Sequence, residues 1–170
     1  MLFSGGPIQG PILMRISLIV IGKTDAAWLR EGLAVYTDRL ARYAPFSYIE
    51  LPDARLRGKP SPQQLRTAQA PILLKALEGI DHVVLLDEHG KQYRSIELAQ
   101  WIESRHARGI RHLALVIGGA YGFDDSIRAR AAEKMSLSKG TFSHQMIRLL
   151  AAEQLYRAQS ILKGEPYHHE

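Results

Sequence analysis

The chain has 170 residues, is 46% hydrophobic, and carries a net charge of +5 with a pI near 9.6. This length supports one compact domain with a substantial core and is short for two. The absence of cysteine excludes disulfides, zinc–thiolate sites and thiol catalysis, and it fits a reducing, cytoplasmic location. No apolar run approaches the roughly 20 residues of a membrane-spanning helix. The basic balance favours anionic partners, nucleic acid first, although a mildly basic enzyme has the same charge.

The first 13 residues, "MLFSGGPIQGPIL", differ in composition from the rest of the chain. Their glycines and prolines are incompatible with a regular element, and no positively charged segment marks a secretory signal. We interpret residues 1–13 as a disordered tail or an expression remnant. Residues 14–170 then form a single domain.

Strand and helix patterns alternate from this point on. The apolar run at residues 15–22 predicts a strand buried on both faces. Thr24 and Asp25 are candidate N-caps for a helix that continues to about Tyr43. The alternating sequence of residues 46–51 predicts a second strand.

A basic loop follows the second predicted strand. It contains Arg55, Arg57 and Lys59, with Arg66 a little further on, among glycine and proline. Such a loop either contacts phosphates or is simply solvated. Ser61 and the proline after it start another helix, which we expect to continue to residue 78.

The remaining elements extend the same alternation. We expect strands at 82–87, 112–119 and 134–138, and helices at 95–108, 124–133 and 143–162. Alternating strands and helices predict an α/β fold with a mainly parallel sheet and helices on both faces. Ligands bind such sheets at the carboxyl ends of the strands.

The fourth predicted strand ends in a glycine-rich turn with Gly118, Gly119 and Gly122. The spacing and the position in the chain do not fit the dinucleotide fingerprint, and there is no P-loop. These glycines could let a flat nucleoside lie against the backbone. The alternative is a tight turn that needs a positive φ angle.

The last predicted helix combines apolar and polar candidates. Glu153 and Arg157 are one turn apart, which suits an ion pair at the surface as well as a functional role. His144 could be a general base, a capping contact or a surface residue, and Tyr156 fits the core better than catalysis. An apolar stripe predicts burial in the core or against a second copy, and comprises Ile147, Leu150, Ala151, Leu155, Ala158 and Leu162.

Five segments together show a family resemblance: "MRISLIVIGK", "LLDEHGK", "LVIGGAYG", "SLSKGTFSHQMIRLLAAEQLYRAQSI" and "GEPYHH". From residue 14 to residue 170 the chain resembles the SPOUT-class ribosomal RNA large subunit methyltransferase H family. The resemblance implies a C-terminal trefoil knot, a homodimer without metal, and methyl transfer from S-adenosylmethionine. The implied acceptor is N3 of a pseudouridine in 23S rRNA, within the assembled ribosome.

The resemblance also implies two groups of site residues. The cofactor pocket is implied to comprise Leu86, Gly118, Leu137, Ser138, Lys139, Gly140, Thr141 and Phe142. Residues for RNA binding or catalysis are implied to be Glu153, Arg157, Tyr167 and His168. Two positions depart from the family. Ser143 replaces the usual proline but is itself a good N-cap, and His169 replaces Arg or Lys and weakens one phosphate contact.

We expect the protein to contribute orientation more than covalent chemistry, because the methyl donor is already activated. Our hypothesis is that Arg157, Tyr167 and His168 hold the target base near the methyl group, with His168 as the candidate proton acceptor. The alternatives are a non-catalytic ribosome-binding factor and a SPOUT enzyme for tRNA or a ribose hydroxyl. A nicotinamide oxidoreductase fits less well, because the glycine spacing is wrong.

Overall fold

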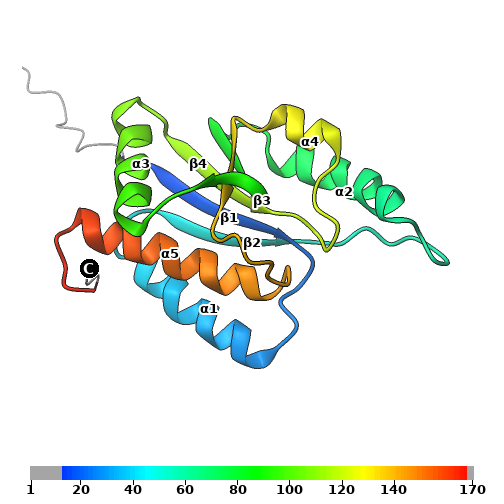
Figure 1. Ribbon diagram of the computed structural model, residues 1–170, viewed down its shortest axis with the longest axis horizontal. Helices are drawn as coiled ribbons and strands as arrows, with labels where there is room; N and C mark the ends of the chain where they lie inside the picture. Colours follow the sequence, from blue (N-terminus) through cyan, green and yellow to red (C-terminus); the bar gives the residue numbers. More distant parts are fainter. Residues whose placement is uncertain (1–12, 168–170) are drawn as a thin grey trace, which may run out of the picture.

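A computed structural model describes residues 13–167 and places every strand in one five-stranded sheet (Figure 1). The strand order is β2-β1-β4-β3-β5, and all pairings are parallel. The strands are β1 (Arg15–Ile21), β2 (Phe46–Leu51), β3 (His82–Gln92), β4 (His112–Ile117) and β5 (Glu133–Ser136). The predicted parallel α/β sheet is confirmed.

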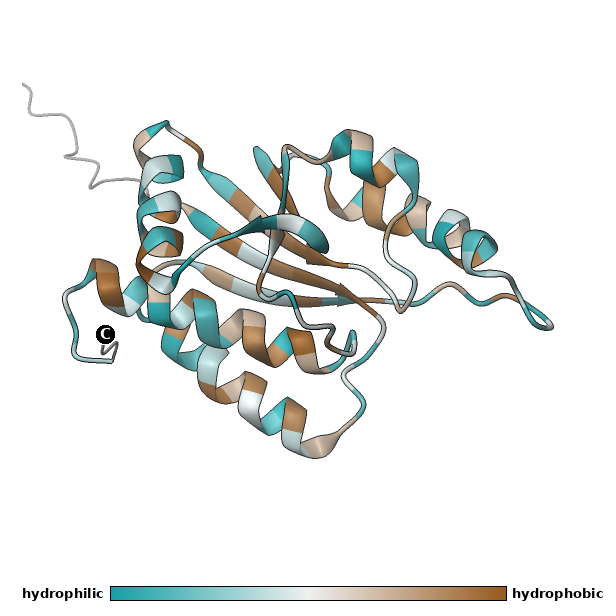
Figure 2. Cartoon of the chain, viewed as in Figure 1, coloured by the Kyte–Doolittle hydropathy of each residue, from teal (hydrophilic) through white to brown (hydrophobic). Residues whose placement is uncertain are grey.

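Helices cover both faces of this sheet, as the alternation predicts (Figure 1). They are α1 (Ala27–Leu40), α2 (Pro62–Ala76), α3 (Ser95–Ala107), α4 (Asp125–Arg130) and α5 (Met146–Leu162). Helices α1, α3 and α5 pack on one face and α2 and α4 on the other, so that two apolar cores form. Figure 2 shows brown segments along the central strands, while the helices carry both teal and brown turns.

Strand β1 explains why the sequence shows a continuous apolar run. Its side chains alternate between the two cores, with Leu18 on the α1–α3–α5 side and Ile19 on the α2–α4 side. Both side chains are fully buried. Burying both faces of the strand removes the polar alternation that an exposed face would require.

The start of α1 differs from the prediction, which placed its N-cap at Thr24 or Asp25. Ala26 precedes the helix and provides no side-chain cap. Thr24 is instead buried, and its hydroxyl donates to the Glu50 carboxylate at 2.6 Å and pairs with the Tyr48 hydroxyl at 2.8 Å. The N-cap prediction was wrong because Thr24 bonds across to β2 rather than to its own helix.

Strand β3 is longer than predicted. It continues past Asp87 to Gln92, and its register with β5 shifts along the way. Gly90 allows this, because a Cβ there would lie 2.4 Å from the Met135 carbonyl carbon. The segment that we predicted as a turn is an irregular strand in close contact with β5.

The last two helices are shorter than predicted. Helix α4 ends at Arg130 rather than near 133, because Glu133 already belongs to β5. Helix α5 begins at Met146 rather than at Ser143. The Ser143 hydroxyl still accepts a hydrogen bond from the Met146 N–H at 3.1 Å, so its predicted capping role survives.

The parallel sheet determines where a ligand site can form. Because all strands point the same way, the carboxyl ends of β2, β1, β4, β3 and β5 meet at one edge. The predicted tail, residues 1–13, lies outside the described residues except for Leu13, which is half exposed. The trefoil knot implied by the family resemblance stays a prediction.

Candidate active site

A pocket with a volume of about 440 Å³ lies at the carboxyl edge of the sheet. Its walls come from the ends of β3, β4 and β5 and from the loops that follow them. Seven of the eight residues predicted to bind the cofactor line it: Leu86, Gly118, Leu137, Ser138, Gly140, Thr141 and Phe142. Lys139 belongs to the same loop, but it is exposed and does not line the pocket.

The glycine turn after β4 forms one wall of the pocket. Gly122 has a φ of +78° and its N–H donates to the Gly119 carbonyl at 3.1 Å. A Cβ on Gly118 would lie 3.0 Å from the Gly122 oxygen, and one on Gly119 would lie 2.8 Å from the Gln69 amide. The predicted tight turn is confirmed, and the same turn lines the pocket.

The loop from β5 to α5 forms a second wall and is held by serine side chains. The Ser136 hydroxyl donates to the Ser138 carbonyl at 2.7 Å, and the Gly140 N–H donates to the Ser138 hydroxyl at 2.9 Å. These bonds tie the loop to itself rather than to neighbouring helices. Phe142 is 42% exposed beside the pocket.

An ion pair that we did not predict borders the pocket. Arg128 donates to the Asp87 carboxylate at 2.8 Å, and both residues line the cavity. Burial raises the pKa of Asp87, but the His89 N–H and Arg128 outweigh burial and hold the pKa below its usual value. The pocket therefore presents an ionised carboxylate at neutral pH. The "LLDEHG" segment was a signal for Asp87, but no sequence pattern links it to Arg128.

His144 and Ile147, at the start of α5, complete the pocket. The buried side chain of Arg148 holds this end of the helix in place, a role that we did not predict. It is fully buried and donates to the backbone oxygens of Ile21, Gly22 and His144 at 2.6 to 3.0 Å. These bonds anchor the start of α5 to the end of β1.

The predicted catalytic residues gather elsewhere, in the C-terminal half of α5. Arg157 contacts the Glu153 carboxylate through two nitrogens, at 2.7 and 3.0 Å, and lies 4.8 Å from the centre of the Tyr167 ring. The Tyr167 hydroxyl donates to Glu153 at 3.4 Å. The structure thus brings Glu153, Arg157 and Tyr167 into one cluster. His168 lies outside the described residues.

Aromatic rings extend this cluster towards α1. Tyr156 packs edge-on against Tyr167, with ring centroids 4.6 Å apart, and Tyr36 on α1 places its hydroxyl 3.4 Å from that of Tyr167. Burial, followed by the Tyr36 hydroxyl, raises the pKa of Tyr167. Tyr156 is half-buried against the core, as predicted, but it also forms part of the cluster.

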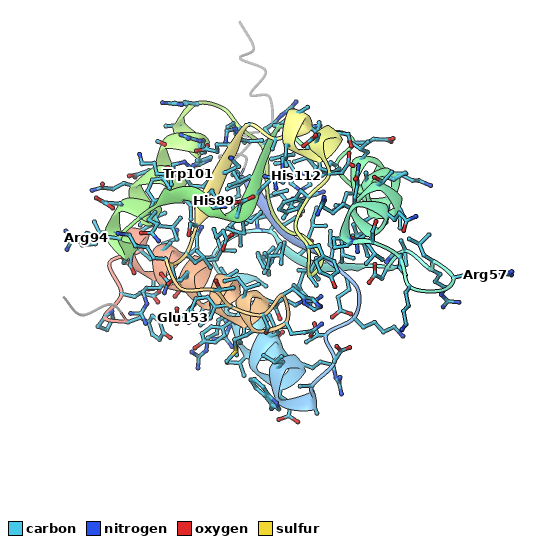
Figure 3. The ribbon with its side chains drawn as sticks, turned by 45° about the vertical axis from the view of Figure 1, so that its right-hand side comes forward. Arg57, His89, Arg94, Trp101, His112 and Glu153 are labelled. Atoms are coloured by element: carbon cyan, nitrogen blue, oxygen red, sulfur yellow. The ribbon has the colours of Figure 1, made fainter. Side chains whose placement is uncertain are left out.

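Within one chain, this cluster and the pocket are separate. Ile147 lines the pocket, and Arg157 follows ten residues later on the same helix, which corresponds to about 15 Å along its axis. Figure 3 shows Glu153 on α5 well apart from His89, which lines the pocket from β3. The apolar stripe of α5, including Ala151 and Leu155, is buried in the chain's own core.

Neither a metal cluster nor a membrane-spanning helix is found in the described part of the chain. Residues 13–167 contain no cluster of three or more side chains suited to hold a metal ion. Over the same range, no helix combines the length and apolar character needed to cross a bilayer.

The fold and the pocket define an α/β protein with a cavity at the carboxyl edge of a parallel sheet, where such folds bind their ligands. Comparison with known proteins specifies the family. Residues 14–168 match the family model described as "Predicted SPOUT methyltransferase", and the chain belongs to this family.

The chain is also similar to curated relatives over their full length. It is 46% identical to a protein of Parabacteroides distasonis and 46% identical to one of Cytophaga hutchinsonii. Each alignment covers 92% of this chain and 100% of the relative, and both relatives are named ribosomal RNA large subunit methyltransferase H.

Solved structures share the fold at much lower sequence identity. A probable methylase family protein from Haemophilus influenzae has a TM-score of 0.52 at 11% identity, covering 92% of this chain and 70% of its own. A probable methyltransferase from Bordetella pertussis has a TM-score of 0.52 at 13% identity, covering 86% of this chain and 95% of its own.

Proposed function

We propose that this protein transfers a methyl group from S-adenosylmethionine to N3 of a pseudouridine in 23S rRNA, on the assembled ribosome. The observation that carries the proposal is the backbone-lined pocket, in a chain 46% identical to complete relatives named ribosomal RNA large subunit methyltransferase H. Because ribosomes are the proposed substrate, we also propose a cytoplasmic location.

The residues of the pocket fit the proposed methyl donor. Its volume of about 440 Å³ is within the range of small-molecule sites. Gly118 and Gly119 remove side chains where a flat adenosine would approach the backbone, and the Asp87 carboxylate, paired with Arg128, is a hydrogen-bond acceptor in the lining. When bound, S-adenosylmethionine supplies an activated methyl group on a positively charged sulfur.

The chain's own residues then have two tasks. The pocket walls exclude water and orient the donor, and orientation of reactants can contribute about 7–11 kcal/mol. Arg157, Tyr167 and His168 hold the uracil-like ring and its phosphates, and His168 accepts the N3 proton. His144, which lines the pocket, is the second candidate acceptor.

A homodimer resolves the separation between the pocket and the predicted catalytic cluster. Along α5 the pocket residue Ile147 is about 9 Å from Glu153 and about 15 Å from Arg157, and in the proposed dimer a second copy brings its tail to the pocket. Large apolar side chains are exposed on α1, in the loop before α5 and on its first residue, and we propose that they contribute to the interface. They are Trp28, Val35, Phe142 and Met146.

Labelled S-adenosylmethionine and ribosomes from a strain without the modification test the proposed function directly. We expect label on N3 of one pseudouridine of 23S rRNA, located by mapping the labelled nucleotide. Label on tRNA or on a ribose hydroxyl would identify a different SPOUT activity. Uptake of S-adenosylmethionine without label in any RNA would instead identify a ribosome-binding factor.

A further inference from the structure

The loop between β2 and α2, residues 52–61, is a cationic surface that the proposed catalytic machinery does not use; we call it the basic loop. Arg55, Arg57 and Lys59 are all exposed. Within residues 13–167, no hydrogen bond, ion pair or ring contact engages these three side chains. Figure 3 shows Arg57 at the far tip of the loop, pointing away from the body of the protein.

The basic loop contains one carboxylate, Asp53, which is exposed. It accepts hydrogen bonds from the Gln69 amide at 2.8 Å and from the Ala54 N–H at 2.7 Å, and within residues 13–167 it makes no ion pair with the three cations. The loop therefore keeps a net positive charge. An exposed positive surface of this kind attracts polyanions.

The basic loop shares an edge with the methyl-donor pocket. It leaves the carboxyl end of β2, and the pocket forms at the carboxyl ends of β3, β4 and β5, which run parallel to β2. Arg66 of α2 donates to the Tyr121 carbonyl at 3.4 Å, and Thr67 donates to Asp124 at 3.3 Å. Tyr121 itself lines the pocket, so the two surfaces are continuous.

The basic loop also encloses a concave surface against the start of α2. This second cavity has a volume of about 620 Å³, and Leu56, Arg57, Lys59 and Ser61 contribute to its lining. A capping box holds the helix start: the Ser61 hydroxyl accepts from the Gln64 N–H, and the Gln64 side chain accepts from the Ser61 N–H. The rigid helix end provides a fixed wall beside the cations.

We propose that the basic loop is a second RNA-contact surface, which binds backbone phosphates of the rRNA strand flanking the target nucleotide. This inference rests on the proposed function. Single-strand binding uses a positive groove that follows the nucleic-acid backbone, and three unpaired cations beside the methyl-donor pocket provide such a surface. The loop contributes affinity for the ribosome and takes no part in methyl transfer.

A charge-neutral variant tests the inference: Arg55→Gln, Arg57→Gln and Lys59→Gln together. Binding to ribosomes that lack the modification is measured at several salt concentrations, without methyl transfer. The plot of log affinity against log salt has a negative slope, and losing three phosphate contacts makes this slope shallower by about 2. Between about 50 and 200 mM salt, the wild type then loses about 15-fold more affinity than the variant.

A matched control removes three exposed cations from elsewhere: Lys75→Gln, Arg108→Gln and Arg111→Gln. Arg111 precedes the first residue of β4, at the sheet edge opposite the pocket. We expect this control to keep the wild-type salt slope. In methylation assays the loop variant should raise KM for ribosomes and leave kcat and the affinity for S-adenosylmethionine unchanged.

The possible outcomes separate the two proposals. The inference about the basic loop is overturned if the loop variant keeps the wild-type salt slope, or if the control variant changes the slope equally. The proposed function still stands in either case if the wild type methylates ribosomes. A loop variant that lowers kcat at saturating ribosomes also overturns the inference. A wild type that neither binds nor methylates ribosomes ends both proposals.

Discussion

At the scale of single residues, the pocket depends on positions where a side chain would collide with backbone. Gly118 has no positive φ, so its requirement is purely one of space: a Cβ would meet the Gly122 oxygen at 3.0 Å and the Phe123 ring at 3.2 Å. Gly122, by contrast, is required by its φ of +78°. The sequence predicted a glycine turn but could not separate these two causes.

Gly118→Ala should therefore disturb the pocket wall. Overpacking of this kind costs about 1–3 kcal/mol, so we expect affinity for S-adenosylmethionine to fall about tenfold or more in calorimetry. Gly79→Ala is the control, because it has a φ of +72° with no atom near its Cβ. It should lose about 1–2 kcal/mol of stability and keep full affinity. Equal affinities for both variants would contradict the role of Gly118.

A second residue-scale feature controls stability in acid. Glu133 accepts hydrogen bonds from Arg105 at 2.7 Å, from His82 at 2.6 Å and from the Trp101 indole at 3.2 Å. Burial raises the pKa of Glu133, but Arg105 and His82 outweigh burial and hold the pKa below its usual value. The carboxylate stabilises the fold when ionised.

Glu133→Gln should lower the free energy of unfolding by about 1–3 kcal/mol at pH 7. Because the folded pKa is depressed, the wild-type advantage is complete above the unfolded pKa of about 4.3 and declines as pH falls through the folded pKa. Urea unfolding at a series of pH values measures this difference in unfolding free energy between the wild type and Glu133→Gln. The exposed Glu103→Gln should change stability by less than about 0.5 kcal/mol. A Glu133→Gln deficit that persists unchanged at the lowest pH would refute this account.

At the scale of elements, the sequence predicted every helix and strand but misplaced several ends. Local patterns determine where an element exists, whereas its ends depend on contacts with distant residues. Thr24 binds Glu50 instead of capping α1, and β3 continues because Gly90 packs against β5. Arg148 shows the same limit, since nothing local distinguishes a buried arginine from a surface one.

Arg148→Met should release the start of α5 from β1. The backbone oxygens of Ile21 and Gly22 lose their donor, so we expect a loss of about 2–4 kcal/mol in unfolding free energy and weaker binding of S-adenosylmethionine. Arg130→Met is the control, because Arg130 donates to the backbone oxygens of Leu77 and Ile80, away from the pocket. Calorimetry should show normal binding for the control. If both variants bind S-adenosylmethionine normally, Arg148 does not help to position the pocket.

At the scale of the whole molecule, the pocket lies at one end of α5 and the cluster of Glu153, Arg157 and Tyr167 lies at the other. The family resemblance implied the members of both groups, and the structure places seven of the eight implied pocket residues around one cavity and these three residues in mutual contact. Because the two groups are separate within one chain, we propose that the reaction uses a composite site between two copies.

Mixed dimers test this composite site. A Gly118→Ala chain binds S-adenosylmethionine about tenfold or more weakly and a His168→Ala chain lacks the proposed acceptor. With S-adenosylmethionine well below its Kd, the first homodimer should therefore keep about a tenth of wild-type activity or less, and the second none. Random mixing should restore about a quarter of wild-type methylation, because half of the dimers contain one intact site. Activity is measured on ribosomes after the two chains are unfolded and refolded together, with each chain treated alone as the control. The composite site would be contradicted if mixing restored no activity, or if His168→Ala alone were fully active.

The sequence by itself determined the parallel α/β fold, because alternating apolar runs are local properties of the chain. Its resemblance to a known family, carried by five motif segments, implied the family and most of the residues that line the pocket. Only the tertiary structure decided the Asp87–Arg128 ion pair, the anchoring by Arg148 and the distance between pocket and cluster. Each of these joins residues far apart in sequence, and their geometry follows from how the helices pack on the sheet.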